Sequence, residues 1–145
     1  MAVIHFTPAD FMQNKIVPAD IYPSEITNIT GPTKSTSGKS LNTFVDITIS
    51  EGQYKGKART ICISTGTKSM SLLGETQFFP QSYLLEIDTA VNGSDSTPRE
   101  YALDTDSLMH KPFEASWGVA TVDGHLINTI DNVHPQGYKE QGPAF

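Results

Sequence analysis

The sequence predicts a mainly β fold, and three observations support this prediction. Residues 41–49 and 112–122 place apolar side chains at every second position, the pattern of strands that are buried on one face. Glycine-containing turns separate the predicted strands, and Asp123-Gly124 is a strong signal for a two-residue hairpin. A helical pattern is clearest over residues 80–91, so we expect one helix among several strands.

The first half of the chain predicts three successive strands. Strand one covers residues 20–30 and strand two covers residues 41–49. The segment between them, residues 31–40, has no aliphatic side chain and predicts a flexible hairpin loop. A turn at Glu51-Gly52 then leads into strand three, which covers residues 58–65 and is rich in threonine and isoleucine.

The second half predicts one helix and a closing hairpin. Residues 66–79 show no clear period and predict a loop with a short ordered piece. The helix over residues 80–91 begins with a proline, which suits the first helical turn, and Asn92-Gly93 predicts its end. The last two strands, residues 112–122 and 125–133, are joined by the predicted two-residue turn.

This order of three strands, a helix and two strands matches a five-stranded OB-like Greek-key barrel, whose one helix lies between strands three and four. A β-sandwich would need about seven strands and no helix. The chain therefore divides into an N-terminal arm over residues 1–19 with a short turn beginning at Pro8, an OB-like barrel over 20–133 and a flexible C-terminal tail over 134–145. The arm can pack on its own barrel or on a neighbouring subunit.

Composition narrows the class of protein. The 145 residues fit one domain, and no segment approaches the roughly 18 apolar residues of a membrane span. The first residues lack the basic and apolar regions of a signal peptide. The single cysteine, Cys62, excludes an internal disulfide and predicts an inert strand residue. We therefore expect a cytoplasmic protein, located in the host-cell cytoplasm if the chain is viral.

The sequence matches catalytic and metal-binding motifs only in part. Gly38-Lys39-Ser40 matches the end of a phosphate-binding loop, but position 33 is threonine instead of glycine, and a strand follows where that motif needs a helix. His110, His125 and His134 have no companion at a metal-ligand spacing. We expect no catalytic residue, no metal site and no cofactor.

Positive charge is concentrated in one segment of an acidic chain. The net charge is −6, yet residues 34–68 contain six of the ten basic residues and only two acidic ones. Because salt screens charges beyond about 8–10 Å, such a local patch can attract phosphates although the whole protein is acidic. The alternative is that these lysines only keep the hairpin turns soluble.

Basic and aromatic residues coincide where an OB barrel binds its ligand. Single-stranded nucleic acid needs cations for its phosphates and aromatic faces for its bases, and OB barrels provide them on strands two and three and on the adjoining loops. Phe44 faces away from the aliphatic side of strand two, although it can also cover a small core or contact a partner subunit. Trp117 shares a face with Phe113 and Val119, so a core position is its alternative. The candidate nucleic-acid-binding residues are Lys34, Lys39, Phe44, Tyr54, Lys55, Lys57, Arg59 and Trp117.

A family resemblance sharpens this hypothesis. Five segments in this order, outside residues 66–103, resemble small phage-encoded single-stranded-DNA-binding proteins of the OB-fold type. They are Pro18–Tyr22, Lys34–Ser40, Leu41–Ile49, Glu51–Lys57 (Glu-Gly-Gln-Tyr-Lys-Gly-Lys) and Leu108–Ala115. The resemblance implies sequence-tolerant binding of single-stranded DNA in support of phage DNA replication or recombination, with RNA as a second ligand to test.

The resemblance also concerns the C-terminal tail. Many single-strand binders end in an acidic tail whose last residue is aromatic and recruits partners. Here the last residue is Phe145, and the acidic residue nearest to it is Glu140. Phe145 is therefore the candidate contact for a replication partner.

Two other classes of function remain open at this stage. The first is a virion structural or assembly protein that uses the barrel for protein–protein contacts, with the N-terminal arm linking copies of the chain into a homo-oligomer. The second is a sugar-binding OB domain, in which Trp117 and Tyr54 would serve as platforms for sugar rings.

Overall fold

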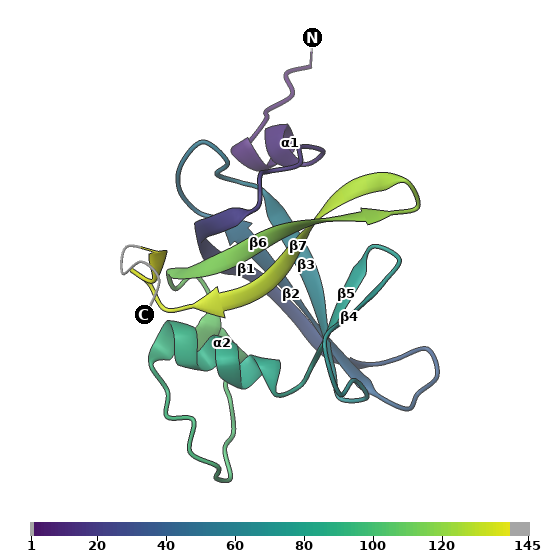
Figure 1. Cartoon of the computed structure of the whole chain (residues 1–145), viewed down its shortest axis with the longest axis vertical. Helices are drawn as coiled ribbons and strands as arrows, with labels where there is room; N and C mark the ends of the chain where they lie inside the picture. Colours follow the sequence, from purple (N-terminus) through teal and green to yellow (C-terminus); the bar gives the residue numbers. More distant parts are fainter. Residues whose placement is uncertain (1, 140–145) are drawn as a thin grey trace.

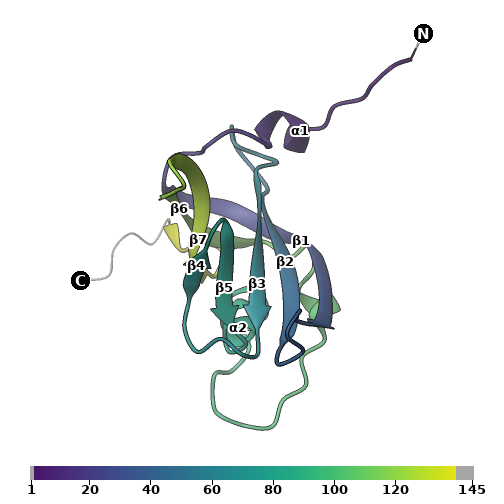
Figure 2. The same cartoon turned by 90° about the vertical axis from the view of Figure 1, so that its right-hand side faces the viewer.

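Seven strands form one curled sheet in the computed structural model, which describes residues 2–139 (Figure 1). The strands are ordered β4-β5-β3-β2-β1-β6-β7, and all neighbours are antiparallel except the parallel pair β3–β5. The sheet curls into a half-barrel, which confirms the mainly β class (Figure 2). The strands are β1 (Asp20–Lys34), β2 (Leu41–Ile49), β3 (Ala58–Ser64), β4 (Ser71–Leu73), β5 (Thr76–Pro80), β6 (Phe113–Val122) and β7 (His125–His134).

The helices are short and few. They are α1 (Pro8–Met12), α2 (Tyr83–Asn92) and the 3-10 turn η1 (Thr105–Leu108). The turn expected at Pro8 is α1, and it begins with a capping box in which Thr7 and Asp10 bond each other's backbone amides. Among residues 2–139, no helix has the length and apolar character needed to cross a membrane.

The predicted count of five strands is wrong. Residues 66–79, expected to form a loop, contain the hairpin β4–β5, with Gly74 in the left-handed conformation at its turn. β5 joins the sheet because its buried side chains, Gln77 and Phe79, register against Ile61 and Ile63 on β3. The helix predicted to lie between strands three and four therefore follows the fifth strand of this sheet, and α1 is an additional helix.

The core lies inside the curl of the sheet. β2 points Val45, Ile47 and Ile49 inward, and all three are fully buried, as its alternating pattern predicts. Among the residues fully enclosed there are Trp117 on β6 and Ile87 on α2, so the helix covers one end of the barrel. Burying side chains of this size stabilises the fold by roughly 1.5–3 kcal/mol each, before the loss of conformational entropy.

A buried side chain, Gln77, links the two ends of the sheet. Gln77 on β5 accepts a hydrogen bond from the backbone amide of Ile130 on β7 and donates one to its carbonyl, both at 2.8 Å. Gln77 is buried, so this amide replaces the backbone ladder that β5 and β7 do not form. Gln77 and Ile130 are 53 positions apart, and their hydrogen bonds join β5 to β7 across the gap in the half-barrel, which we call the seam.

The root of the N-terminal arm is fixed on the barrel. Val17 is fully buried, and its backbone amide and carbonyl both bond the side-chain amide of Asn128 on β7 at 2.9 Å. The Lys57 ammonium donates to the carbonyl of Lys15 at 2.6 Å. Beyond this root the arm extends away from the barrel in both views (Figures 1 and 2).

Candidate nucleic-acid interface

The structure divides the predicted basic patch between two ends of the barrel. The β1–β2 loop and the β2–β3 turn lie at opposite ends of β2, and nine residues of extended chain span roughly 30 Å. Lys34 and Lys39 belong to the first end, while Lys55 and Lys57 belong to the second. One continuous cluster of all these cations is therefore excluded.

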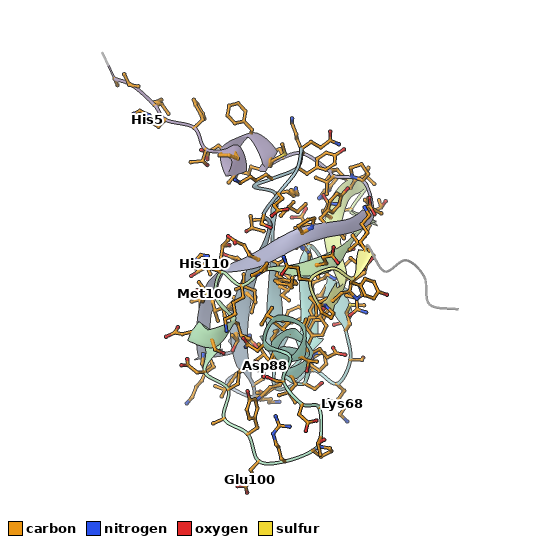
Figure 3. The ribbon with its side chains drawn as sticks, turned by 90° about the vertical axis from the view of Figure 1, so that its left-hand side faces the viewer. His5, Lys68, Asp88, Glu100, Met109 and His110 are labelled. Carbon is orange, nitrogen blue, oxygen red and sulfur yellow. The ribbon has the colours of Figure 1, made fainter. Side chains whose placement is uncertain are left out.

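A third lysine joins the first end. The backbone amide of Leu41 donates to the Thr65 hydroxyl at 2.9 Å, and the Thr65 amide donates to the Leu41 carbonyl at 3.0 Å. These bonds hold the end of the β1–β2 loop beside the start of the loop that carries Lys68. Figure 3 labels Lys68 near the lower end of the molecule. We call Lys34, Lys39 and Lys68 the basic end. Residues 31–45 and 64–74, which form this part of the surface, contain no acidic residue.

Phe44 lies on the outer face of the sheet, as predicted, and 37% of its surface is exposed. It registers against Cys62 on β3, which in turn registers against Phe78 on β5, so the three side chains share one face. Two strand spacings place the Phe44 and Phe78 backbones about 10 Å apart. The outer face of β2, β3 and β5 therefore carries two aromatic rings.

A small cavity opens next to Phe44. Its volume is about 310 Å³, and its lining includes Phe44, Arg59, Thr60, Cys62 and Glu75. The Arg59 guanidinium donates to the backbone carbonyl of Glu75, and burial lowers the pKa of Arg59 while the Glu75 carboxylate opposes that shift. Within residues 2–139 the buried Nε of Arg59 has no hydrogen-bond partner. Arg59 and Glu75 therefore place one positive and one negative charge beside an exposed ring.

The surroundings of Lys57 do not fit phosphate binding. Its side chain is buried and already bonds the Lys15 carbonyl, and burial lowers the pKa of the ammonium group, followed by repulsion from Arg59. Its observed contact is structural, because it fixes the root of the arm. Lys55, two residues earlier, is exposed.

Tyr54 faces an acidic cleft. Its ring meets that of Tyr22 edge to face, with centroids 5.6 Å apart. The two tyrosines line a cleft of about 700 Å³ together with Asp20, Glu51, Glu114 and Lys139, whose ammonium group pairs with Asp20 at 2.9 Å. Three carboxylates against one cation leave the cleft acidic, which disfavours phosphates near Tyr54.

Trp117 lies in the core, which corrects its placement among the ligand-binding residues. It is 1% exposed, and its indole N–H donates to the Ser24 hydroxyl at 3.2 Å. A ligand cannot reach a ring enclosed in this way. Cys62 lies on a strand as predicted, and it is buried, which raises the pKa of its thiol and keeps it protonated.

Two residues of this surface escaped sequence reasoning. Lys68 lies within the basic segment, but the sequence around it predicts a loop. A loop prediction does not indicate which other loop Lys68 lies next to. Phe78 belongs to β5, whose five residues were too few to show an alternating period in a segment read as a loop. The predicted partner contact, Phe145, lies outside the described residues together with Glu140.

Residues 2–139 contain no group of three or more His, Cys, Asp or Glu side chains arranged to hold a metal ion. No family model matches the chain, and no curated protein matches it either.

Proposed function

We propose that the chain binds single-stranded DNA without strong sequence preference, through the basic end and the aromatic outer face of β2, β3 and β5. The supporting observation is that Lys34 at the end of β1, Lys39 in the β1–β2 loop and Lys68 in the loop after β3 belong to one end of the sheet, and that Phe44 is exposed on β2 three positions after Leu41. Cations attract the phosphates, and rings stack the bases whatever their identity.

The barrel supports the same proposal at the level of topology. Without the β4–β5 hairpin, the elements are β1, β2, β3, α2, β6 and β7, with β1 paired to both β2 and β6. This is the element order of a five-stranded OB-like Greek-key barrel, with the hairpin as an insertion between its third strand and its helix. OB barrels bind oligonucleotides on the face that Phe44 occupies here.

In this proposal the protein supports phage DNA replication or recombination in the host-cell cytoplasm, as the sequence resemblance implies. It uses no cofactor and catalyses no reaction. Phe145 remains the proposed contact for a replication partner.

The first experiment is a titration of fluorescently labelled oligo-dT with the full chain at 50 and 300 mM salt. If three phosphates are neutralised, the slope of log K against log salt is about −2, and affinity falls on the order of 40-fold over this range. Absent binding, or binding that does not depend on salt, would overturn the proposal. An oligo-U of equal length, titrated in parallel, decides between DNA and RNA.

Charge reversal then locates the interface. Lys34→Glu combined with Lys39→Glu is expected to weaken oligo-dT binding at least 10-fold at 50 mM salt, because two of three cations become repulsive. Lys55→Glu, an exposed lysine at the opposite end of β2, is the matched control and is expected to change affinity less than 2-fold. Equal losses in both variants would place the strand along the whole length of β2.

The sugar-binding alternative loses support because Trp117, one of its two platforms, is buried. The assembly alternative gains support from the arm, which exposes large apolar side chains, and both functions can coexist in one protein.

A further inference from the structure

The N-terminal arm exposes an unusual amount of apolar surface. Val3, Ile4, Phe6 and Phe11 are each 65–75% exposed, and α1 buries no residue. The rings of Phe6 and Phe11 contact each other, with centroids 5.9 Å apart, but cover little else. Four large apolar side chains within nine positions form a patch of the kind that marks a protein–protein contact.

The arm leaves the barrel at a defined place. Pro8 and Ala9 pack so closely on the β2–β3 turn that a side-chain carbon at Gly56 would lie 2.6 Å from the Ala9 nitrogen. With Val17 and Lys15 also bonded to the barrel, the arm is anchored at the end opposite α2. Figure 3 shows His5 on the arm at one end, with Asp88 and Glu100 toward the other.

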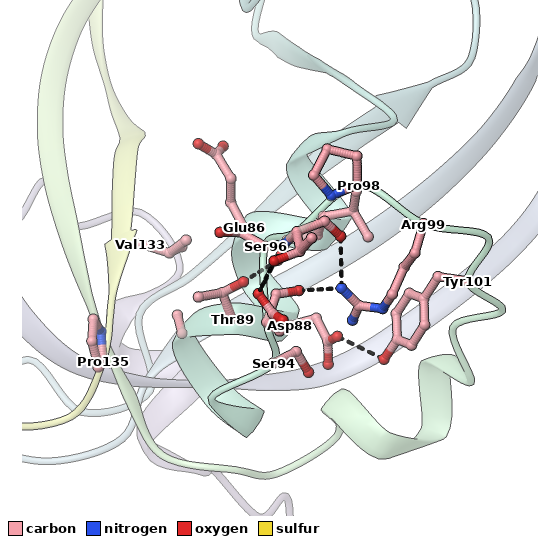
Figure 4. Close-up of a pocket in the computed structure, with 14 residues that line it drawn as sticks. Glu86, Asp88, Thr89, Ser94, Ser96, Pro98, Arg99, Tyr101, Val133 and Pro135 are labelled. Atoms are coloured by element: carbon pink, nitrogen blue, oxygen red, sulfur yellow. Dashed lines mark hydrogen bonds between the residues drawn. The ribbon is translucent and has the colours of Figure 1, made fainter.

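A largely apolar pocket lies at that other end. It has a volume of about 410 Å³ between α2, the loop over residues 94–101 and the end of β7 (Figure 4). We call it the α2 pocket. Its apolar lining includes Leu85, Ala90, Pro98, Val133 and Pro135.

The α2 pocket has a fixed polar rim. Arg99 donates to the backbone carbonyls of Asp95 and Thr97 at 2.7 and 2.9 Å, and its guanidinium lies 4.8 Å from the centre of the Tyr101 ring. The Tyr101 hydroxyl donates to the buried carboxylate of Asp88 at 2.8 Å. The long loop is therefore tied to α2, and the pocket has the size and mixed lining of a binding site.

We propose that the apolar side chains of the arm of one copy pack into the α2 pocket of a second copy. Phe6 and Phe11 are about two-thirds exposed, so together they have roughly 200–330 Å² left to bury. With Val3 and Ile4 the contact stays below the roughly 800 Å² per partner of a standard interface, so we expect assembly that depends on concentration. In the structure the arm points away from its own pocket, so another copy is the available acceptor.

This contact joins unlike surfaces, so it is heterologous. Each copy carries one arm at one end and one pocket at the other, and repetition gives an open head-to-tail chain instead of a closed dimer. The inference goes beyond the proposed function and holds whether or not nucleic acid binds.

The test uses two variants with complementary defects. Phe6→Ser with Phe11→Ser removes the arm's anchors but keeps the pocket, and Leu85→Glu places a charge in the pocket but keeps the arm. Sedimentation velocity should show mass rising with concentration for the unmodified chain and monomers for each variant. An equimolar mixture of the two variants should give a one-to-one heterodimer, because only one intact arm–pocket contact forms.

Leu126→Glu is the matched control, because Leu126 is 53% exposed on β7 and Leu85 is 51% exposed on α2. It should assemble like the unmodified chain. A monomeric unmodified chain, assembly by the Leu85→Glu variant alone, or a mixture that stays monomeric would each overturn the proposal. Short oligo-dT should bind both variants with unchanged affinity, so a failure of assembly and a failure of DNA binding are separate results.

Discussion

Lys55 and Lys57 are two positions apart, yet their surroundings give them different roles. Lys55 is exposed, whereas Lys57 is buried against the carbonyl of Lys15, 42 residues earlier in the chain. Sequence spacing predicts which residues share a face, but it does not predict which distant segment covers that face. The same limit applies to Tyr54, whose ring faces carboxylates contributed by β1 and β6. Burial and neighbours decide which of the predicted residues remain candidates.

Phe44 is the aromatic residue at which stacking on a base is best tested separately from packing in the core. Replacing it by alanine is expected to weaken oligo-dT binding by about 1–3 kcal/mol, or roughly 5- to 150-fold, through the lost base contact. Because 37% of Phe44 is exposed, the loss of stability should be smaller than for a fully buried phenylalanine. Val119→Ala, at a similarly exposed apolar residue on β6, is the control and should leave affinity unchanged. Equal affinity of Phe44→Ala and the unmodified chain would remove Phe44 from the interface.

At the scale of elements, the longer strands were predictable and the short hairpin was not. β2 begins and ends at the predicted residues because nine positions of strict alternation leave one register. α2 lies within three residues of its predicted limits. β4 has three residues and β5 has five, too few for a period, and β5 is held by a parallel partner and by Gln77. The place of β5 in the sheet depends on contacts with distant residues, which the local sequence pattern does not predict.

The hairpin tips of β4–β5 and β6–β7 are joined by an ion pair between Glu75 and His125. The hydrogen bond that the imidazole donates to the Glu75 carboxylate, reinforced by the charge of that carboxylate, raises the pKa of His125 above its usual 6.5. Because the folded-state pKa is higher than the unfolded one, the pair stabilises the fold fully below about pH 6.5. This contribution disappears as the pH rises through the folded-state pKa.

His125→Gln should therefore lower the melting temperature at pH 5.5 and have no such effect at pH 9. Burial lowers the pKa of His134, which acts in the opposite direction, so each comparison is made with the unmodified chain at the same pH. Glu75→Gln should reproduce the pattern. A difference in melting temperature that is the same at both pH values would show that the ion pair does not contribute.

At the scale of the whole molecule, the two ends of the barrel have different chemistry. One end holds the arm and the acidic Tyr22–Tyr54 cleft, and the other holds the three lysines of the basic end and the α2 pocket. An open head-to-tail chain of copies would bring the arm of one copy to the end of the next that carries the basic end. Assembly and nucleic-acid binding then use neighbouring surfaces without sharing residues.

Closure of the half-barrel depends on Gln77, and this gives a prediction about the whole fold. Gln77→Leu keeps the volume of the side chain but leaves the Ile130 amide and carbonyl without partners in a buried site. Each such group costs about 1–3 kcal/mol, so the free energy of unfolding should fall by about 2–6 kcal/mol. That is a large share of the roughly 5–15 kcal/mol that stabilise a typical domain.

Urea denaturation measures this loss, and Gln53→Leu, at an exposed position in the β2–β3 turn, is the control with an expected change within about 0.5 kcal/mol. Hydrogen exchange should also accelerate at the Ile130 amide in Gln77→Leu, because no backbone partner on β5 replaces the lost acceptor. A loss below about 1 kcal/mol with unchanged exchange at Ile130 would mean that the Gln77 hydrogen bonds contribute little to holding β7. The hydrogen bonds between Gln77 and Ile130 would then be present in the folded barrel without contributing much to its free energy of unfolding.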